Sequence, residues 1–514
     1  MGESVVKGYH IIFVLCMLVL IPGTVLGAVP GDILKNLAFG LPDGPEWGYG
    51  LDTSADGNVT VCGVAYPDDS IDLGHLGNGD VWVIRFDKNS TVLWEKLIGG
   101  NETDYALSIR NLPDGGAALI GTTGSFNGDV SDYHGNGDMW VVNLGPDGNI
   151  RWERALGETN TDEGSDLVVL PDGHIIVCGY SMSSRTGDLW MLRLDSKGNI
   201  IWQRAYGSDG RDSGTSIITT SDGSLVACGN TNSTDNATSP GTTSSDIWVL
   251  KTDLNGTPLW DYSYGGSSLD WGHSVIELTS GDLMVAAVTA SSDGDVSNNH
   301  GAGDIWLLRL DPEGNLIWEK SFGGSFSDNV WKLEPSAGGG AYFVGDSYSV
   351  DGDFSGNHGE ADLVIGEVDE NGTLLWHRLI GGSSVDRGSW VGKTDTGTLM
   401  ITGMTASSDG DLSGNHTSGD LWVLEVQGNE DKTPFNVLSI GPLGGDGPVP
   451  TDPDGDGKYE DLNGNGKMDL QDPTVFFQYF DWISKQDFQS AFDFNENGGL
   501  DLSDVQALFA EIQP

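Results

Sequence analysis

A sevenfold repeat with four predicted strands per unit, followed by two calcium-loop motifs, predicts an all-β, seven-bladed β-propeller with a small α-helical calcium-binding domain at its C-terminus. Glycine supplies 77 of the 514 residues, which is about twice its usual share and favours many short strands joined by tight turns. We expect a signal peptide at 1–28, the propeller at 29–427, a Gly/Pro-rich linker at 428–451 and the calcium-binding domain at 452–514.

The repeat is marked by the string Asp-x-Trp, whose aspartate recurs at intervals of 58, 50, 58, 58, 58 and 58 residues. Complete copies begin at Asp80, Asp138, Asp188, Asp246, Asp304 and Asp420, and a degenerate copy with valine in place of tryptophan begins at Asp362. A second tryptophan follows each of the first six units, at Trp94, Trp152, Trp202, Trp260, Trp318 and Trp376. Seven copies at this period predict seven blades.

Each unit contains four candidate strands. In the unit from Ile98 to Trp152 they are Leu107–Leu112, Ala117–Thr122, Met139–Leu144 and Ile150–Leu156. Asp-Gly turns separate the first strand from the second and the third from the fourth, and such turns suit the positive φ angles of tight hairpins. Four strands per unit are typical of a propeller blade, with the first strand at the axis and the fourth at the rim.

The two ends of the repeat region complement each other. The seventh unit ends at Trp422–Val426 without a fourth strand, whereas Ile33–Gly40 reads as a fourth strand that precedes the first unit. We therefore predict that the N-terminal strand completes the last blade and closes the ring, which removes an exposed sheet edge.

Over residues 32–427 these repeats resemble secreted propeller repeats of the quinoprotein-like and tryptophan-docking kind. The resemblance implies blade architecture and no particular activity, because a propeller carries many functions. The motif Asp-x-x-Gly-x-x-x-Trp at Asp195–Trp202 and Asp311–Trp318 suggests a quinone-dependent dehydrogenase as a third class of function. The adjacent cysteine pair found in many such enzymes is missing here.

The net charge of −52 disfavours binding to nucleic acids and to anionic membranes, both of which attract basic proteins. Lys7, the apolar run Ile11–Ile21 and small residues near position 27 predict a cleaved signal peptide and export to the cell surface or medium, without a membrane anchor. Eight Asn-x-Ser/Thr sequons fit a glycosylated surface protein: Asn58, Asn89, Asn101, Asn232, Asn236, Asn255, Asn371 and Asn415.

Three cysteines remain once Cys16 leaves with the signal peptide. Cys62, Cys178 and Cys228 each precede a glycine at the same repeat position in different units. This spacing favours buried, unpaired thiols over disulfides.

The long loops between the second and third strands carry acids and histidines in five units. The residues are Asp69, Asp72 and His75; Asp129 and His134; Asp293, Asp295 and His300; Asp351, Asp353 and His358; and Asp409, Asp411 and His416. Further acids at Asp104, Asp212, Asp270, Asp328 and Asp386 are expected on the same face. One hypothesis is a ring of acidic pockets for divalent cations. The other, which the repetition favours, is that these side chains cap their own turns.

Three aromatic residues follow acidic residues near the axis, namely Trp47, Tyr105 and Trp271. Flat rings beside carboxylates can stack on sugars, and they can equally fill gaps between blades.

The C-terminal region carries two twelve-residue motifs with oxygen ligands at the spacing of calcium loops. The predicted ligands of the first loop are Asp461, Asn463, Asn465, Lys467 (through its backbone), Asp469 and Asp472. Those of the second are Asp493, Asn495, Asn497, Gly499 (through its backbone), Asp501 and Asp504, and an adjoining acidic stretch adds Asp452, Asp454 and Asp456. Ca²⁺ is therefore the predicted cofactor.

Each loop leads into an apolar segment expected to be helical, without the helix that would precede the loop in a full EF-hand. This order, with aspartate at position 12, resembles a type I dockerin domain over residues 452–514 and implies calcium-dependent folding and docking onto a cohesin-like partner. The pairs Leu470–Gln471 and Leu502–Ser503 replace the usual Ser-Thr recognition pair, which leaves the partner open. A purely structural calcium module is the alternative.

Two functions compete. The first is a secreted, non-catalytic binding protein whose propeller meets a carbohydrate or protein ligand and whose tail tethers it. The alternative is a polysaccharide-degrading glycoside hydrolase or lyase in a cellulosome-like complex. No catalytic pair can be chosen among 76 acidic residues, so we assign no catalytic and no organic-cofactor residue.

Overall fold

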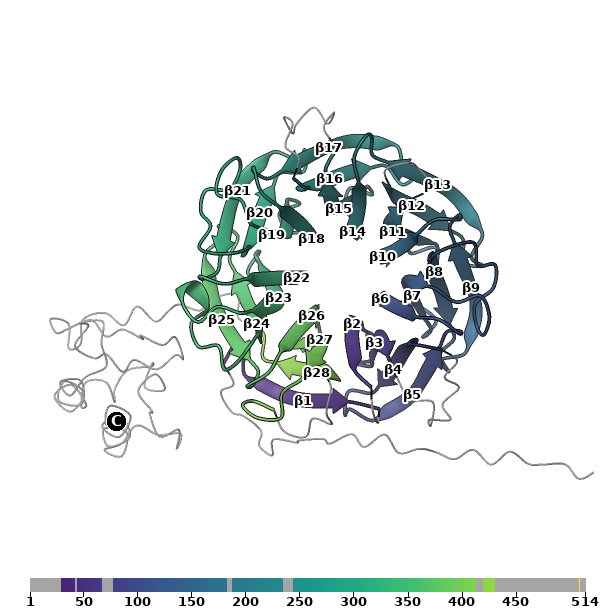
Figure 1. The fold of residues 1–514 in the computed structure, drawn as a ribbon, viewed down its shortest axis with the longest axis horizontal. Helices are drawn as coiled ribbons and strands as arrows, with labels where there is room; N and C mark the ends of the chain where they lie inside the picture. Colours follow the sequence, from purple (N-terminus) through teal and green to yellow (C-terminus); the bar gives the residue numbers. More distant parts are fainter. Residues whose placement is uncertain are drawn as a thin grey trace, which may run out of the picture. The chain divides into compact units, whose positions relative to one another are not determined.

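The computed structural model describes residues 29–41, 44–66, 77–182, 187–233, 244–394, 396–412 and 419–429, together with Leu508. Within these residues, 28 strands form seven four-stranded sheets arranged around one axis (Figure 1). The predicted seven-bladed β-propeller is confirmed. The chain divides into two units, Met1–Lys432 and Thr433–Pro514, and the propeller belongs to the first. The predicted signal peptide, the linker beyond residue 429 and, apart from Leu508, the calcium-binding domain lie outside the described residues.

Six blades consist of four consecutive antiparallel strands, ordered from the axis to the rim. Blade one comprises β2 (Glu46–Thr53), β3 (Val59–Ala65), β4 (Asp80–Phe86) and β5 (Val92–Ile98). Blade two comprises β6 (Asp104–Asn111), β7 (Ala117–Thr123), β8 (Asp138–Leu144) and β9 (Ile150–Leu156). Blade three comprises β10 (Asp162–Val169), β11 (Ile175–Ser181), β12 (Asp188–Leu194) and β13 (Ile200–Tyr206).

The next three blades follow the same order. Blade four comprises β14 (Asp212–Thr219), β15 (Leu225–Thr231), β16 (Asp246–Thr252) and β17 (Pro258–Tyr264). Blade five comprises β18 (Asp270–Glu277), β19 (Leu283–Thr289), β20 (Asp304–Leu310) and β21 (Leu316–Phe322). Blade six comprises β22 (Asp328–Pro335), β23 (Ala341–Ser347), the short 3₁₀ helix η1 (Gly352–Phe354), β24 (Asp362–Val368) and β25 (Leu374–Ile380).

Blade seven joins both ends of the propeller. It comprises β26 (Asp386–Lys393), β27 (Leu399–Thr405), β28 (Asp420–Val426) and, at the rim, β1 (Ile33–Phe39). β1 pairs antiparallel with β28, and Asn36 Oδ1 accepts a hydrogen bond of 2.8 Å from the Trp422 indole. The closure predicted from the sequence is therefore confirmed (Figure 1).

The first tryptophan of most repeats packs inside its blade. Trp82, Trp140, Trp306 and Trp422 are buried, and the indole N–H groups of Trp140 and Trp306 donate to Glu153 and Glu319 on the neighbouring rim strands, at 2.9 and 2.7 Å. Asn36 takes the place of these glutamates in the closing blade. A buried indole N–H without such a partner would destabilise the fold.

The second tryptophan connects neighbouring blades in five of the six units, whereas the Trp376 indole N–H donates to Glu367 of its own blade at 2.8 Å. Trp94 in β5 donates its indole N–H to the carbonyl oxygen of Pro146, 2.9 Å away in the β8–β9 turn of the next blade. Gly148 in that turn has a φ of 74°, and a Cβ atom there would lie 2.7 Å from the Trp94 ring. Glycine thus meets two demands at once, the left-handed backbone and the close ring contact.

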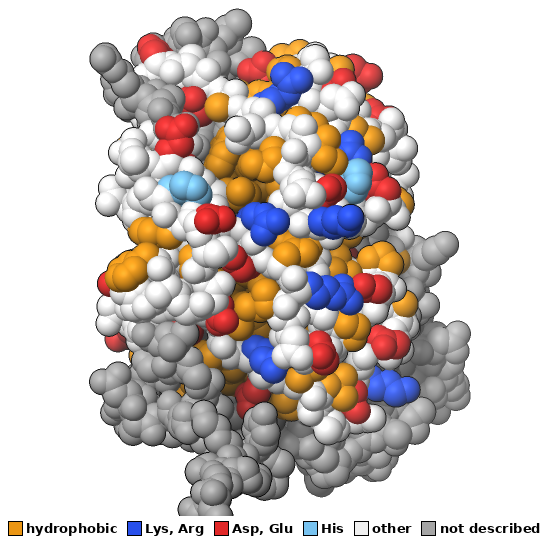
Figure 2. All heavy atoms as spheres, turned by 90° about the vertical axis from the view of Figure 1, so that its right-hand side faces the viewer, with side chains coloured by type: hydrophobic (Ala, Val, Ile, Leu, Met, Phe, Trp, Pro, Cys, Tyr) orange, Lys and Arg blue, Asp and Glu red, His pale blue; other side chains and the backbone are white. Residues whose placement is uncertain are grey.

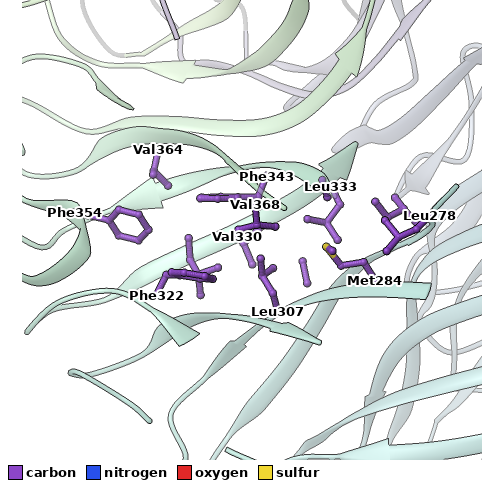
Figure 3. Packing of buried hydrophobic residues seen from close by; sticks show 14 of the residues in the cluster. Leu278, Met284, Leu307, Phe322, Val330, Leu333, Phe343, Phe354, Val364 and Val368 are labelled. Carbon is purple, nitrogen blue, oxygen red and sulfur yellow. The ribbon is translucent and has the colours of Figure 1, made fainter. Parts of the chain in front are cut away.

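The core consists of seven apolar layers, each between two facing blades. Between blades five and six, Phe322, Leu307 and Met284 face Phe343, Phe354 and other residues of the next sheet (Figure 3). The second and third strands are buried along almost their whole length because both of their faces are covered. The three cysteines are buried and unpaired, as predicted, and burial raises the pKa of each thiol.

A search for membrane-spanning helices among the described residues finds none of the required length and hydropathy.

Candidate ligand-binding site

Aromatic side chains gather around the axis near the start of the inner strands. Trp47 in β2, Trp271 in β18 and Trp331 in β22 are 39%, 50% and 38% exposed, and Tyr105 in β6 is half-buried. The strands that carry them surround the axis (Figure 1). We call these four residues the axial aromatic residues. Exposed tryptophan is uncommon in a soluble protein, so a group of them marks a candidate binding surface.

Polar groups hold one part of this surface in place. The Trp331 indole N–H donates to Asp346 Oδ1 at 2.7 Å, and Asn329 Nδ2 donates to Asp346 Oδ2 at 2.9 Å. The imidazole of His273 lies edge-on to the Trp331 ring, with centroids 4.7 Å apart. The His273 side chain keeps partial contact with solvent, but the protein atoms around it desolvate the charged imidazolium and lower its pKa to about 4. The ring is therefore neutral at pH 7.

A basic group reaches the same end of the axis from blade seven. Arg387 Nη2 donates to the Tyr348 hydroxyl at 2.6 Å, and its Nε lies 4.0 Å from Asp346 Oδ2. Burial raises the pKa of Asp346, in spite of the hydrogen bonds from Trp331 and Asn329. Flat aromatic faces beside fixed donors and acceptors are the chemistry of a site that binds a ligand with both apolar and polar surfaces.

A buried ionic cluster lies deeper along the inner strands. Asp166 in β10 accepts hydrogen bonds from Ser108 and Arg110 in β6, at 2.7 and 3.2 Å, and Lys332 Nζ in β22 lies 3.4 Å from it. Lys332 and Arg110 also lie over the ring of Trp390, 3.8 and 4.7 Å from its centroid. Burial alone would raise the pKa of Asp166, but the two cations hold it below its usual value. This cluster ties four blades together beneath the aromatic residues.

The acids of the long loops fasten each loop to the linker that precedes its blade. Asp293 Oδ1 accepts from the Ser267 amide at 2.7 Å, and Asp295 Oδ2 accepts from the Gly265 amide at 3.1 Å. Asp351 and Asp353 do the same in blade six, as do Asp409 and Asp411 in blade seven, and Asp129 accepts from Gly99 in blade two. These contacts give the loop acids a structural role, which is to join each long loop to the preceding linker instead of capping its own turn.

The loop histidines pair with the first acid of the following strand. His134, His300 and His358 place Nδ1 at 2.9, 2.7 and 2.6 Å from Asp138, Asp304 and Asp362. Among the residues that the structure describes, no group of three or more His, Cys, Asp or Glu side chains has the arrangement of a metal site. Asp69, Asp72, His75 and His416 lie outside the described residues.

The acids at the start of the inner strands contact hydroxyl groups of the long loops, in keeping with the expected shared face, but they are buried instead of exposed there. Asp104, Asp212, Asp270, Asp328 and Asp386 are fully buried. Asp270, for example, accepts hydrogen bonds from the hydroxyls of Thr289 and Ser291 at 2.5 and 2.7 Å. Each lies near a second buried acid from the preceding blade: a Cβ atom on Gly323 would lie 2.7 Å from both Asp304 Oδ1 and Asp328 Oδ2. Two carboxylates this close favour a protonated form, and burial raises the pKa of both.

Glu46 occupies this position in blade one and provides a test of the buried pairs. Burial raises its pKa to about 9, and the nearby Asp420 carboxylate adds to the shift. Between its usual pKa of 4.5 and about 9, the folded chain keeps a proton that the unfolded chain releases, so stability falls as pH rises through this window. Glu46→Gln is expected to raise the melting temperature at pH 8 by roughly 2 °C or more and to change it little at pH 4.5.

Differential scanning calorimetry at the two pH values measures this difference. Glu102→Gln, at an exposed linker position, is the control and is expected to change neither value. An equal shift for Glu46→Gln at both pH values would contradict the assignment of a proton to Glu46.

The predicted calcium ligands can be placed only in the sequence. All of them lie outside the described residues: Asp452, Asp454, Asp456, Asp461, Asn463, Asn465, Lys467, Asp469, Asp472, Asp493, Asn495, Asn497, Gly499, Asp501 and Asp504.

Of the three aromatic residues singled out in the sequence, Trp47 and Trp271 are exposed near the axis and Tyr105 is half-buried. Sequence reasoning missed Trp331, His273, Arg387 and Asp346, each of which occurs in one blade only.

The sequence matches no protein-family model, and no curated protein is significantly similar to it. Solved structures match much of the chain at low identity and low TM-score. A catalytically inactive virginiamycin B lyase from Staphylococcus aureus, with quinupristin, is 10% identical, with 76% of this chain and 98% of that chain covered and a TM-score of 0.43. The WD40 domain of Neurospora crassa Pan2 is 11% identical, with 76% and 98% covered and a TM-score of 0.41.

Sqt1 from Chaetomium thermophilum, bound to the N-terminus of the ribosomal protein L10, is 13% identical, with 78% and 100% covered and a TM-score of 0.41. At these identities the likeness concerns the fold, and no activity or partner is carried over from it. The chain is a seven-bladed β-propeller in its first unit, and its function has to be argued from its own residues.

Proposed function

We propose that this protein is a secreted or cell-surface, non-catalytic binding protein. Its propeller is the scaffold, the axial aromatic residues contact the ligand, and the C-terminal region tethers the protein through a calcium-dependent, dockerin-like domain to a cohesin-like partner. The observation that carries the proposal is the group of exposed tryptophans held beside fixed polar groups at one end of the axis.

The surface chemistry favours a carbohydrate as the ligand. Trp47, Trp271 and Trp331 expose flat apolar faces, and Asn329, Arg387 and Asp346 place donors and acceptors beside one of them. Sugars present apolar C–H faces edged with hydroxyl groups, which suits this combination. The net charge of −52 disfavours strongly acidic polysaccharides.

Affinity electrophoresis of the full chain through gels containing single neutral polysaccharides tests this proposal. We expect retardation by at least one of them, and loss of that retardation in the double variant Trp271→Ala, Trp331→Ala. Phe126→Ala is the control, because Phe126 is 65% exposed in a loop of blade two. Release of reducing ends from the same polysaccharides would instead support the alternative, a glycoside hydrolase or lyase.

The tether makes a separate prediction. Because the loop carboxylates of residues 452–514 repel one another until an ion neutralises them, folding of this region is expected to be coupled to Ca²⁺ binding. Calorimetry of the full chain is expected to show one transition that moves up by roughly 10 °C or more with millimolar Ca²⁺ and one that does not move, which belongs to the propeller.

Asp472→Ala and Asp504→Ala are each expected to reduce the calcium-dependent shift. Glu313→Gln, an exposed acid in a turn of blade five, serves as the charge-matched control and is expected to leave the shift unchanged. Identical scans in Ca²⁺ and in chelator would contradict the calcium module without affecting the binding role of the propeller.

A further inference from the structure

Blade three differs from the other six blades in the length of one loop. In blade two the connection from β7 to β8 covers residues 124–137, whereas in blade three the connection from β11 to β12 covers only residues 182–187. This accounts for the one repeat interval of 50 residues among intervals of 58. The short connection lacks the Asp-apolar-Ser triplet that the long loops of blades two, five, six and seven share.

In these four blades, the apolar residue of the triplet closes a slot between two blades. Val130, Val296, Phe354 and Leu412 are buried in the apolar layers of blades two, five, six and seven. Val130 packs among Ile98 of the preceding blade and Trp140 and Ala155 of its own.

Two backbone contacts fix the triplet in its slot. In blade two the Asp129 amide donates to the Gly99 carbonyl oxygen at 2.8 Å, and the Gly99 amide donates to Asp129 Oδ2 at 3.2 Å. The same pair of bonds joins Asp295 to Gly265, Asp353 to Gly323 and Asp411 to Gly381. The Ser131 hydroxyl adds a bond to Glu153, the residue that also accepts the Trp140 indole N–H.

A cavity of about 440 Å³ lies at the equivalent place in blade three, lined by Leu156, Gly157, Trp190, Ile200, Gln203 and Ala205 among others. Leu156, Gly157, Trp190 and Ala205 correspond in the repeat to Ile98, Gly99, Trp140 and Ala155, which surround Val130 in blade two. We call this cavity the blade-three slot.

In blade three, the side chain and backbone groups that a long loop would contact lack the corresponding packing and hydrogen bonds. Trp190 is half-exposed, whereas Trp140 is buried. Within the described part of the chain, the Trp190 indole N–H and the Gly157 amide have no hydrogen-bond partner, although Trp140 and Gly99 each have one. Gln203 stands where blade two has Glu153. The surrounding surface of blades two and three mixes apolar and charged side chains (Figure 2), and Ile200 is 46% exposed.

We propose that the blade-three slot binds a peptide turn of a partner protein that carries the chemistry of the missing loop: an aspartate, then a valine, leucine or phenylalanine, then a serine. The apolar side chain fills the cavity beside Trp190, the aspartate caps the Gly157 amide, and the serine hydroxyl meets Gln203. This inference deepens the proposed binding function and adds a peptide site distinct from the axial aromatic residues.

The chain itself supplies the probe. A fluorescein-labelled peptide with the sequence of residues 291–300, which contains the Asp-Val-Ser triplet of blade five, is titrated with the full chain and followed by fluorescence polarisation. We expect saturable binding that is lost when the valine of the peptide is replaced by aspartate. Polarisation that rises equally with both peptides, or with neither, would overturn the proposal.

Three variants locate the binding. Ala205→Leu fills the slot and is expected to weaken binding at least tenfold. Gln203→Glu restores the acceptor found in blade two and is expected to tighten binding about threefold, through the serine hydroxyl. Ile201→Ala, at an exposed rim position next to the slot, is the control and is expected to leave the affinity unchanged. Equal affinity for all four proteins would place the peptide elsewhere and refute the slot.

A loop graft and a deletion distinguish a partner peptide in the slot from the chain's own tail and from a second copy of the chain. Replacing residues 182–187 with residues 290–303 is expected to close the slot, abolish peptide binding and leave polysaccharide retardation intact. If deletion of residues 433–514 strengthens peptide binding tenfold, the slot is filled by the chain's own tail and the partner proposal is wrong. Dimers that dissociate on adding the peptide would likewise assign the slot to a second copy. Loss of polysaccharide retardation alone would count against the aromatic residues and not against the slot.

Discussion

Removal of residues 29–40 is expected to lower the melting temperature of the propeller by roughly 10 °C or more and to make the remaining chain self-associate. These residues contain β1, whose Leu37 and Phe39 are each 1% exposed and whose Phe39 ring stacks on Phe86 of blade one, with centroids 6.0 Å apart. Each buried side chain of this size contributes about 1.5–3 kcal/mol. The deletion also exposes the edge of β28 and leaves the Trp422 indole without Asn36.

Calorimetry and sedimentation velocity on the truncated chain measure both effects. A synthetic peptide of residues 29–41 is expected to restore the melting temperature in part, because it supplies the missing strand. Lys35→Ala, which keeps the strand and removes a rim ion pair with Glu425, is the control and is expected to change stability by less than ~1 kcal/mol. A truncated chain that melts with the full chain and stays monomeric would show that β1 does not close the ring.

Asp166→Ala is expected to destabilise the propeller by about 3–5 kcal/mol, because it leaves the buried Lys332 and Arg110 without their common carboxylate. The carboxylate also accepts hydrogen bonds from the Ser108 and Ser216 hydroxyls, at 2.7 and 3.2 Å. In the folded chain the pKa of Asp166 lies below its usual value. The Asp166 carboxylate therefore stabilises the fold in full above the usual pKa, which applies to the unfolded chain. This stabilisation is lost as pH falls through the lowered pKa of the folded chain.

Urea unfolding at pH 7 measures the loss, and a second substitution identifies its cause. Asp166→Ala combined with Lys332→Met is expected to recover part of the stability, since the double variant leaves one buried charge fewer without a partner. Additive losses in the double variant would mean that Asp166 acts through its serine contacts instead. Tyr105 and Trp331 lie on β6 and β22, the strands that also carry Arg110 and Lys332. Polysaccharide binding therefore serves as a readout of whether these strands keep their positions in the variants.

The fold was predictable because the residues that build it recur in every unit. The paired tryptophans and the Asp-Gly turns each have one structural role, and that role repeats with the period. Strand limits shift by a few residues, as where β6 begins at Asp104 and not at Leu107, because the buried acid and its hydroxyl partners extend the strand. The tendency of aspartate to occur in turns gave no sign that the acids at the start of the inner strands are buried.

The binding surface was predictable only in part, and the reason is the repetition itself. Trp331, Arg387 and Asp166 occupy inner-strand positions that hold different residues in the other blades, so no period points to them. Comparing the inner strands position by position would have singled them out as departures from the repeat. The short connection in blade three is the same kind of signal, since the interval of 50 residues was visible in the sequence while the slot beneath it required the structure.

The position of β28 has a mechanical consequence for a protein held by its C-terminal region. β28 lies between β27 and β1, antiparallel to both, and the chain leaves it at Gln427, whose amide and carbonyl groups bond to Asp32 and Gly31. Under the proposed C-terminal tether, a force on the chain directed along β28 would load its two hydrogen-bonded ladders together in shear. An antiparallel hairpin at the end of a sheet would instead open one bond at a time. The closure by β1 thus doubles the number of hydrogen-bonded ladders that hold β28 in the sheet.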